Sequence, residues 1–260
     1  MLRRLLRPLL ATSIPAAAAA AARRFSHRVP SLQLFQRAAQ RASGKIAIAS
    51  NGHQYSYRDL LHDSHRLGQR ICGALGTAAG GDLSEARIAF LTPSTYEYAV
   101  AQWATWGAGG VAVPLSSHHP VPELEYYVRD SQASLIVGHS SFTALLKPLA
   151  EACGVPYLEI SDMAPASAHA PLDVSAPSLN ISTMRRAMLI YTSGTTGKPK
   201  GVVSTHSMIE AQVNSMVGPW AWTSDDHILN ILPLHHVVRQ LVQPSSMFEF
   251  YNYKSNLNVF

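Results

Sequence analysis

Residues 187–201 read AMLIYTSGTTGKPKG, a short apolar run that opens into a loop of small, hydroxyl-bearing and cationic residues. The apolar run Ala187–Ile190 predicts a buried strand. Glycines let backbone N–H groups approach an anion, since no Cβ stands in the way. The serine and threonine hydroxyls and the two lysines add donors and positive charge. A strand that opens into such a loop predicts a site for a polyanion, in the simplest case the phosphates of a nucleotide.

The loop is not a phosphate loop of the Walker A type. That motif needs four residues between its first glycine and its Gly-Lys pair, followed by Ser or Thr. Here two residues separate Gly194 from Gly197, and Lys198 is followed by Pro199, which has no metal-binding hydroxyl. The other interpretation is a flexible, solvent-exposed hairpin. Ordinary hairpins do not combine this many hydroxyl groups, glycines and lysines, so phosphate binding is preferred.

The segment Thr192–Gly201 resembles, over its whole length, the phosphate-binding signature of the adenylate-forming superfamily. That superfamily includes acyl-CoA synthetases, luciferases and the adenylation domains of peptide synthetases. Leu232–His236, with the sequence LPLHH, resembles the motif that lines its acyl pocket. Residues 99–134 and Trp220–Thr223 are similar to the mitochondrial malonyl-CoA synthetases within the superfamily. The resemblance extends from about Lys45 to Val237.

This resemblance implies an AMP-forming acid–CoA ligase that uses ATP, Mg²⁺ and coenzyme A. A carboxylate attacks the α-phosphorus of ATP and displaces pyrophosphate, and the thiol of coenzyme A then displaces AMP. Positive donors and Mg²⁺ stabilise the leaving pyrophosphate. The implied acid is malonate or methylmalonate, in mitochondrial fatty-acid metabolism. The alternatives are another acyl-CoA synthetase or adenylate-forming enzyme, and a non-catalytic short isoform or an incorrectly assembled gene.

The resemblance also implies which residues carry these roles. His236 would orient the acyl carboxylate or shape the wall of the site, and the alternative for His235-His236 is packing at a strand end. Lys198 fits phosphate binding and a solvent-facing position equally well. No metal ligands are expected, and His118-His119 is interpreted as part of a loop. The residues expected to hold the phosphates are Thr192, Ser193, Gly194, Thr195, Thr196, Gly197, Lys198 and Lys200.

The amino-terminal segment is basic and free of acidic residues. No Asp or Glu precedes Asp59, and the arginines within residues 1–25 account for the whole formal charge of +5. The rest of the chain is therefore neutral, which argues against a nucleic-acid partner. Leucines and arginines lie on opposite faces of a helix in this segment, as in a mitochondrial transit peptide. We expect cleavage near Phe25 and a matrix location. A secretory signal is the alternative, and residues 8–22 are too few for a transmembrane helix.

The pattern beyond this leader predicts an α/β fold with mainly parallel sheets and flanking helices, because apolar strands alternate with helices of about ten residues. We expect a first α/β subdomain over 26–160, a linker over 161–182, and the start of a nucleotide-binding subdomain over 183–237. Trp103 and Trp106 are expected in the core, and Cys72 and Cys153 as buried free thiols. The expected elements are helices over 32–42, 96–106, 122–131, 142–153 and 208–217, a helix capped by Ser56 and Asp59, a hairpin of 45–50 with 54–57, and strands over 87–91, 111–115, 135–138, 157–160, 188–192, 201–204 and 226–232. Ser207 and Glu210 are expected to form a capping box for the helix over 208–217.

Residues 238–260 differ in composition from what precedes them. The resemblance ends at Val237, and the segment is rich in aromatic residues. We expect a divergent tail that comes from an alternative exon, a retained intron or an incorrect gene model and that packs poorly. The alternative is a natural divergent end with its own packing. The superfamily's magnesium-binding Glu and catalytic Lys have no counterpart in these 260 residues. The chain by itself is therefore expected to be an inactive amino-terminal fragment.

Overall fold

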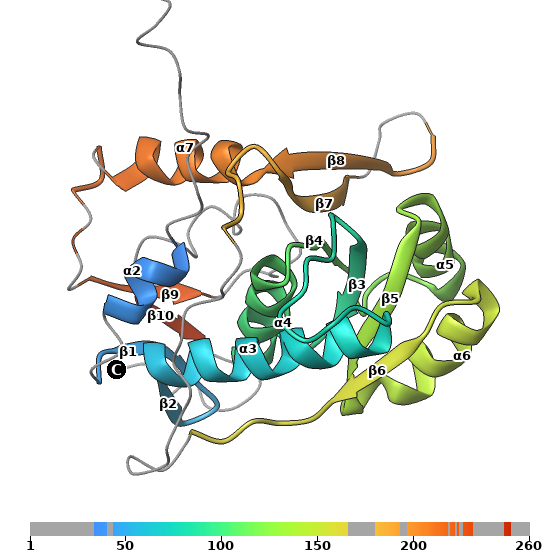
Figure 1. The fold of residues 1–260 in the computed structure, drawn as a ribbon, viewed down its shortest axis with the longest axis horizontal. Helices are drawn as coiled ribbons and strands as arrows, with labels where there is room; N and C mark the ends of the chain where they lie inside the picture. The colour runs from blue at the N-terminus through green and yellow to red at the C-terminus, as the bar shows by residue number, and fades with distance from the viewer. Residues whose placement is uncertain are drawn as a thin grey trace, which may run out of the picture. The chain divides into compact units, whose positions relative to one another are not determined.

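A six-stranded, mainly parallel sheet carries most of the chain in the computed structural model (Figure 1). The structure describes residues 34–40, 44–165, 180–192, 197–217, 219–221, 223, 226–230 and 247–250. The helices among them are α2 (Leu34–Gln40), α3 (Tyr57–Ala74), α4 (Tyr96–Gly107), α5 (Val121–Asp130), α6 (Thr143–Cys153) and α7 (His206–Val217), with a 3₁₀ turn at Ser140–Phe142. The strands are β1 (Ile46–Ser50), β2 (His53–Ser56), β3 (Arg87–Leu91), β4 (Val111–Pro114), β5 (Ala133–His139), β6 (Tyr157–Ile160), β7 (Arg186–Thr192), β8 (Lys200–Thr205), β9 (His227–Asn230) and β10 (Met247–Phe250).

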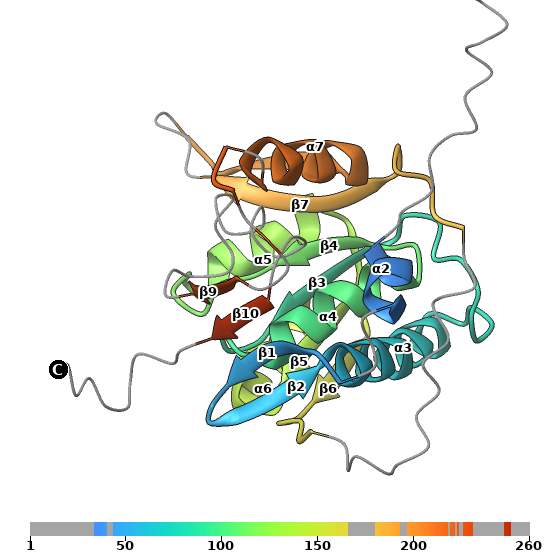
Figure 2. The same ribbon diagram turned by 90° about the vertical axis from the view of Figure 1, so that its left-hand side faces the viewer.

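The strand order in the larger sheet is β6-β5-β3-β4-β7-β8. Neighbouring strands are parallel except β7 and β8, which form an antiparallel hairpin. Figure 2 shows β7, β4 and β3 side by side. The sheet therefore takes strands from both sides of the 161–182 segment. Residues 166–179 of that segment lie outside the described residues. The predicted α/β class with mainly parallel strands is confirmed.

Both faces of the sheet are buried at its central strands, which explains why β3, β4 and β5 are apolar without alternation. Ile88 and Phe90 of β3 belong to a core that includes residues of α3 and α4. Ala89 and Leu91, which point the opposite way, belong to a second core with residues of α5 and α6. Trp106, 2% exposed, lies in the first core together with Trp103, so both tryptophans are core residues as predicted.

Local signals in the sequence account for the start of the chain's longest described helix. Asn51 and Gly52 adopt positive φ angles of 52° and 78° in the turn between β1 and β2, as a tight hairpin requires. Ser56 Oγ accepts a hydrogen bond from the backbone N–H of Asp59, while the Asp59 carboxylate accepts from the N–H of Ser56 at 2.7 Å. The predicted capping box of α3 is confirmed, and Tyr57 belongs to the helix rather than to the hairpin.

The predicted capping box of α7 is wrong. The helix begins at His206, two residues earlier than predicted. The hydroxyl of Thr205 accepts a hydrogen bond from the backbone N–H of Met208 at 3.3 Å. Thr205 therefore caps the helix, and Ser207 lies inside its first turn. Ser207 instead shares a hydrogen bond of 2.9 Å with the Thr205 hydroxyl.

A second, four-stranded sheet has the order β2-β1-β10-β9. β10 is parallel to both of its neighbours, with Phe248 opposite Ile48 of β1 and Ile228 of β9. The expectation that the tail packs poorly is wrong for Met247–Phe250, because these residues are paired on both sides. Tail residues 238–246 and 251–260 lie outside the described residues.

Two further findings concern expectations from composition. Both cysteines are free thiols; Cys72 is buried as predicted, whereas Cys153 is only half-buried at the end of α6. None of the helices that the structure describes has the length and apolar character needed to cross a membrane.

Candidate phosphate-binding site

The loop with the TSGTTGKPKG sequence joins β7 to β8 at the carboxyl end of β7. Thr192 and Lys200 are the last pair of the antiparallel ladder, and the Thr192 hydroxyl donates to the Lys200 carbonyl at 3.4 Å. This pair closes the base of the loop. β4 runs parallel to β7, so the loop and the segment that follows β4 lie at the same edge of the sheet. Ligands of open α/β sheets bind at this edge.

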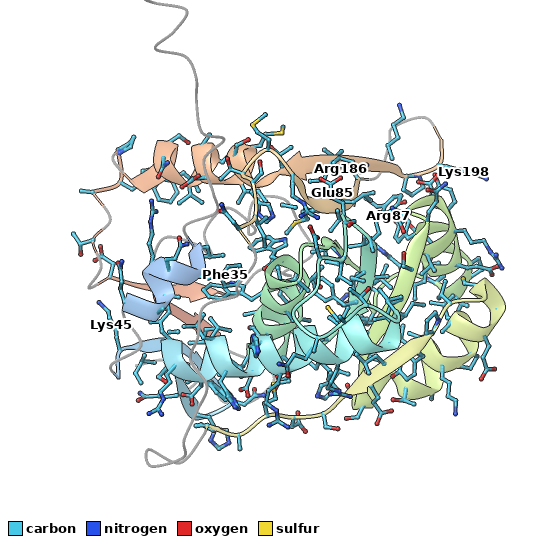
Figure 3. The ribbon with its side chains drawn as sticks, in the orientation of Figure 1. Phe35, Lys45, Glu85, Arg87, Arg186 and Lys198 are labelled. Atoms are coloured by element: carbon cyan, nitrogen blue, oxygen red, sulfur yellow. The ribbon has the colours of Figure 1, made fainter. Side chains whose placement is uncertain are left out.

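Helix α5 supports both ends of the loop through its tyrosines. The Tyr126 hydroxyl donates to the Pro199 carbonyl at 3.0 Å, and the Lys198 Nζ lies 5.3 Å from the centre of the Tyr126 ring. Figure 3 shows Lys198 at the end of the β7–β8 hairpin beside α5. Tyr191, which enters the loop from β7, stacks on Tyr127 with 4.2 Å between ring centres. The loop is therefore attached to α5 on entry and on exit.

The tyrosine hydroxyls of this cluster act as hydrogen-bond donors. Tyr191 donates to the Asp130 carboxylate at 2.7 Å, and Tyr127 donates to the Glu123 carboxylate. Burial, and after it the hydrogen bond to Asp130, raises the pKa of Tyr191. Burial and the Glu123 carboxylate likewise raise the pKa of Tyr127. Both phenols therefore stay protonated at neutral pH, and their hydrogen bonds persist.

The opposite end of β7 is held by two arginines. Arg185 donates to both carboxylate oxygens of Asp82, at 2.7 and 2.8 Å, and to the Gly109 carbonyl at 2.7 Å. Arg186 donates to the Glu85 carboxylate from its backbone N–H and its Nε, at 2.8 and 2.7 Å. Figure 3 shows Glu85 and Arg186 next to each other. Hydrogen bonds from Arg185 lower the pKa of the Asp82 carboxyl. Burial raises the pKa of the Glu85 carboxyl, but the hydrogen bonds from Arg186 outweigh it, so that the net shift is downward.

The second residue of β7 is fixed by the core. The indole N–H of Trp106 donates to the Ala187 carbonyl at 2.7 Å, across 81 residues of sequence. Ala187 itself has no exposed surface. The strand that carries the loop is thus held at its start by ion pairs and by α4, and at its end by α5. A loop on so fixed a strand can present preorganised donors to an anion.

The structure brings together only part of the predicted site. Thr192, Gly197, Lys198 and Lys200 lie at the base and on the return side of the loop, and both lysines are exposed. Ser193, Gly194, Thr195 and Thr196 lie outside the described residues, as do His235 and His236. The roles expected for these residues remain predictions.

The segment after β4 forms part of the same edge. His118 follows Ser116, whose hydroxyl accepts from the His118 backbone N–H at 3.2 Å, and the His119 ring contacts Tyr127 edge-on at 5.3 Å. The predicted loop at His118-His119 is confirmed. Within the described part of the chain, no group of three or more His, Cys, Asp or Glu residues could hold a metal ion.

Sequence reasoning missed the tyrosines that support the loop. Tyr126 and Tyr127 lie about sixty-five residues before the loop, and nothing in the local pattern of α5 distinguishes them from ordinary core residues. Only the pairing of β4 with β7 brings α5 next to the hairpin. Two adjacent tyrosines at a predicted carboxyl edge are the signal that could have suggested a role.

The fold and this loop define a member of the AMP-binding enzyme family, and the chain belongs to it: the family matches residues 35–248. Two curated relatives are the mitochondrial malonate–CoA ligase ACSF3 of Homo sapiens, 46% identical over 194 residues, and the malonate–CoA ligase of Arabidopsis thaliana, 34% identical over 223 residues. These matches cover 74% and 79% of this chain. The chain spans about a third of the curated relatives it matches, 33% and 37% of their lengths.

A solved structure with a similar fold also belongs to an ATP-binding protein. The ATP-bound structure of MatB from Rhodopseudomonas palustris matches with a TM-score of 0.68 and 26% sequence identity. The match covers 85% of this chain and 45% of that one. Most of this chain therefore shares the fold of a relative solved with ATP bound.

Proposed function

We propose that this chain supplies the phosphate-binding part of an ATP-dependent, AMP-forming acid–CoA ligase whose acid is malonate. The observation that carries the proposal is the TSGTTGKPKG loop, closed by Thr192 and Lys200 at the carboxyl end of β7. Family membership and the malonate–CoA ligases among the relatives support it. The substrates are a carboxylic acid, ATP and coenzyme A. Methylmalonate is the second candidate acid, because it differs from malonate by one methyl group.

The loop would act on the leaving group of the first step. The carboxylate oxygen of the acid bonds to the α-phosphorus of ATP, and the bond from that phosphorus to the bridging oxygen breaks. Negative charge then builds on pyrophosphate, and donors fixed around it lower the barrier. We assign this role to the backbone and hydroxyl donors of residues 192–197 and to Lys200. In the second step the thiol sulfur bonds to the acyl carbon, AMP leaves, and the thiol proton is released.

Magnesium would come with the nucleotide. The described residues contain no cluster of carboxylates or histidines that could bind the ion, and Mg²⁺ is commonly held by few protein ligands and by substrate phosphates. We therefore assign no residue of this chain to it. When bound, the ion would neutralise charge on the phosphates. His236 is proposed to face the acyl carboxylate.

The location and division of the chain complete the proposal. Residues 1–25 would be a transit peptide, and the enzyme would work in the mitochondrial matrix in fatty-acid metabolism. The relatives named for mitochondria support this location. The body would divide into a first α/β subdomain over 26–160, a linker over 161–182, the start of a nucleotide-binding subdomain over 183–237 and a divergent tail over 238–260.

The test uses the native protein. An antibody raised against the exposed segment 73–82 would capture it from fractionated mitochondria of the source organism, and the captured protein would be assayed with ATP, Mg²⁺, coenzyme A and a panel of acids. We expect AMP and thioester with malonate at a kcat/KM at least tenfold higher than with acetate or palmitate. Equal use of all acids would overturn the malonate assignment, and no acid-dependent AMP would overturn the ligase itself.

A further inference from the structure

We propose that Tyr126 is a positioning residue for the phosphate loop, and that it holds the Lys198 ammonium on its ring so that, of the two lysines, Lys200 meets the phosphates. This inference rests on the proposed nucleotide role of the loop. It gives a task to Lys198, which the sequence alone left open between phosphate binding and a solvent-facing position.

Tyr126 contacts two consecutive residues on the return side of the loop. Its hydroxyl donates to the Pro199 carbonyl at 3.0 Å, and its ring lies under the Lys198 ammonium at 5.3 Å. Proline fixes its own φ angle, so a hydrogen bond to its carbonyl constrains the direction in which the chain re-enters β8. A single side chain therefore fixes both the backbone and the cation of this turn.

The helix that carries Tyr126 is itself fixed to the entry side of the loop. Tyr191 lies edge-on to Tyr126 at 6.0 Å, stacks on Tyr127, and donates to the Asp130 carboxylate at 2.7 Å. The two strands that flank the loop are thus tied to one turn of α5. Tyr126 therefore positions the end of the loop, at Pro199, relative to its start at Tyr191, which α5 already holds.

The geometry separates the two lysines. The Lys198 ammonium is directed onto an aromatic face, where the ring quadrupole attracts it. Lys200 lies opposite Thr192 at the base of the loop and is exposed. A cation on the ring adds positive potential near the loop, whereas a free lysine at the base can donate directly to an anion. Lys198 therefore orders the loop, and Lys200 binds its ligand.

The first measurement reports the contact without any ligand. Reductive ¹³C-methylation of the full 260-residue chain keeps the lysine charge and gives each lysine an NMR signal. A cation above a ring is shifted upfield by the ring current. We expect one upfield signal, absent in Lys198→Arg, absent in Tyr126→Leu, and retained in Tyr126→Phe, which keeps the ring.

The second measurement adds Mg²⁺–ATP and follows the same signals. We expect the Lys200 signal to move while that of Lys198 stays upfield. The dissociation constant should rise about fivefold in Tyr126→Leu and about twofold in Tyr126→Phe, in line with one exposed cation–π contact and one hydrogen bond. Tyr157→Phe is the matched control: its hydroxyl shares a 3.0 Å hydrogen bond with Thr143 at the opposite edge of the sheet, and its loss should leave the constant unchanged.

The outcomes distinguish the positioning role of Tyr126 from the phosphate-binding function of the loop. An absent upfield signal, or a Lys198 signal that leaves the ring when nucleotide is added, would overturn the role of Tyr126. Equal affinities in wild type, Tyr126→Leu and Tyr157→Phe would do the same. An upfield signal in a chain that shows no nucleotide response would instead contradict the phosphate-binding function, while the contact itself would stand.

Discussion

At the residue scale, His206 is a buried histidine at the start of α7. Its side chain packs edge-on against Trp106 with 5.5 Å between ring centres, and the residue is 3% exposed. Burial first, and the nearby Arg185 second, lower the pKa of His206 from 6.5 to about 4. The His206 ring is therefore neutral in the folded chain at neutral pH.

This histidine should make folding sensitive to acid. In the unfolded chain this histidine binds a proton below pH 6.5, whereas in the folded chain it does so only below about pH 4. Its contribution to stability is therefore complete above pH 6.5 and is lost as the pH falls from 6.5 to about 4. We expect a loss of roughly 3 kcal/mol between pH 7 and pH 4 from this group. His206→Phe keeps a ring against Trp106 and should remove that share of the slope in urea unfolding curves. An unchanged slope in His206→Phe would refute the assignment.

At the scale of elements, β7 depends on contacts that reach across the sequence. Arg185 donates two hydrogen bonds to the Asp82 carboxylate and a third to the Gly109 carbonyl, a set of contacts called the Arg185 clamp below. The start of the strand is thereby fixed to the segment before β3. A planar guanidinium can make these bonds together, whereas an ammonium cannot. The clamp is partly exposed, with 40% of the Asp82 side chain accessible, and its energy is correspondingly modest.

Arg185→Lys should therefore lower the free energy of unfolding by about 1 kcal/mol. It should also weaken the protection of β7 amides from hydrogen exchange, because the strand loses its anchor. Arg37→Lys is the matched control, since Arg37 only meets Glu210 at 3.8 Å with most of its side chain exposed. Chemical denaturation and exchange of both variants give the comparison. Equal stabilities for the two variants would show that the clamp contributes nothing beyond an ordinary surface pair.

The same long-range contacts explain what the sequence could and could not predict. β3 and β6 have the predicted bounds, because each is a short apolar segment with clear breaks on both sides. The α3 cap was also readable, since both partners lie within four residues. The pairing of β10 with β1 had no local signal, because it joins residues two hundred positions apart. The support that Tyr126 gives to the loop was hidden for the same reason.

At the scale of the whole molecule, the chain spans about a third of the relatives that match it. Its described part carries the base and the return side of the proposed phosphate loop, and the sheet that fixes them. The reaction also needs the ribose, the acid and coenzyme A to be held in line with that loop. Alignment of this kind accounts for about 7–11 kcal/mol of a barrier.

The isolated chain should therefore make no measurable malonyl-CoA. Purified residues 26–260 with ATP, Mg²⁺, malonate and coenzyme A should release AMP no faster than a blank, because the loop alone cannot align the reactants. Chromatography of AMP and of the thioester provides the measurement. Turnover within tenfold of a complete malonate–CoA ligase would contradict this expectation.

The proposed transit peptide over residues 1–25 leads to a separate prediction about mitochondrial import. Isolated mitochondria should import the radiolabelled chain and shorten it near Phe25, because residues 1–25 are rich in arginine and free of acidic residues. Replacing Arg3, Arg4 and Arg7 by Gln should abolish import. Recovery of protease-sensitive chain with an intact Met1 would count against a matrix location.

The central claim, that this loop binds the phosphates of ATP in an acid–CoA ligase, is tested most directly by malonate-dependent ATP–pyrophosphate exchange. The assay would use a chimera in which residues 35–237 of this chain replace the matched segment of the human relative. We expect exchange in the chimera, a loss of at least a hundredfold in Lys200→Ala, and a loss below tenfold in Lys198→Ala, since only Lys200 is left to meet the leaving pyrophosphate. Full exchange in a folded Lys200→Ala chimera would contradict the account.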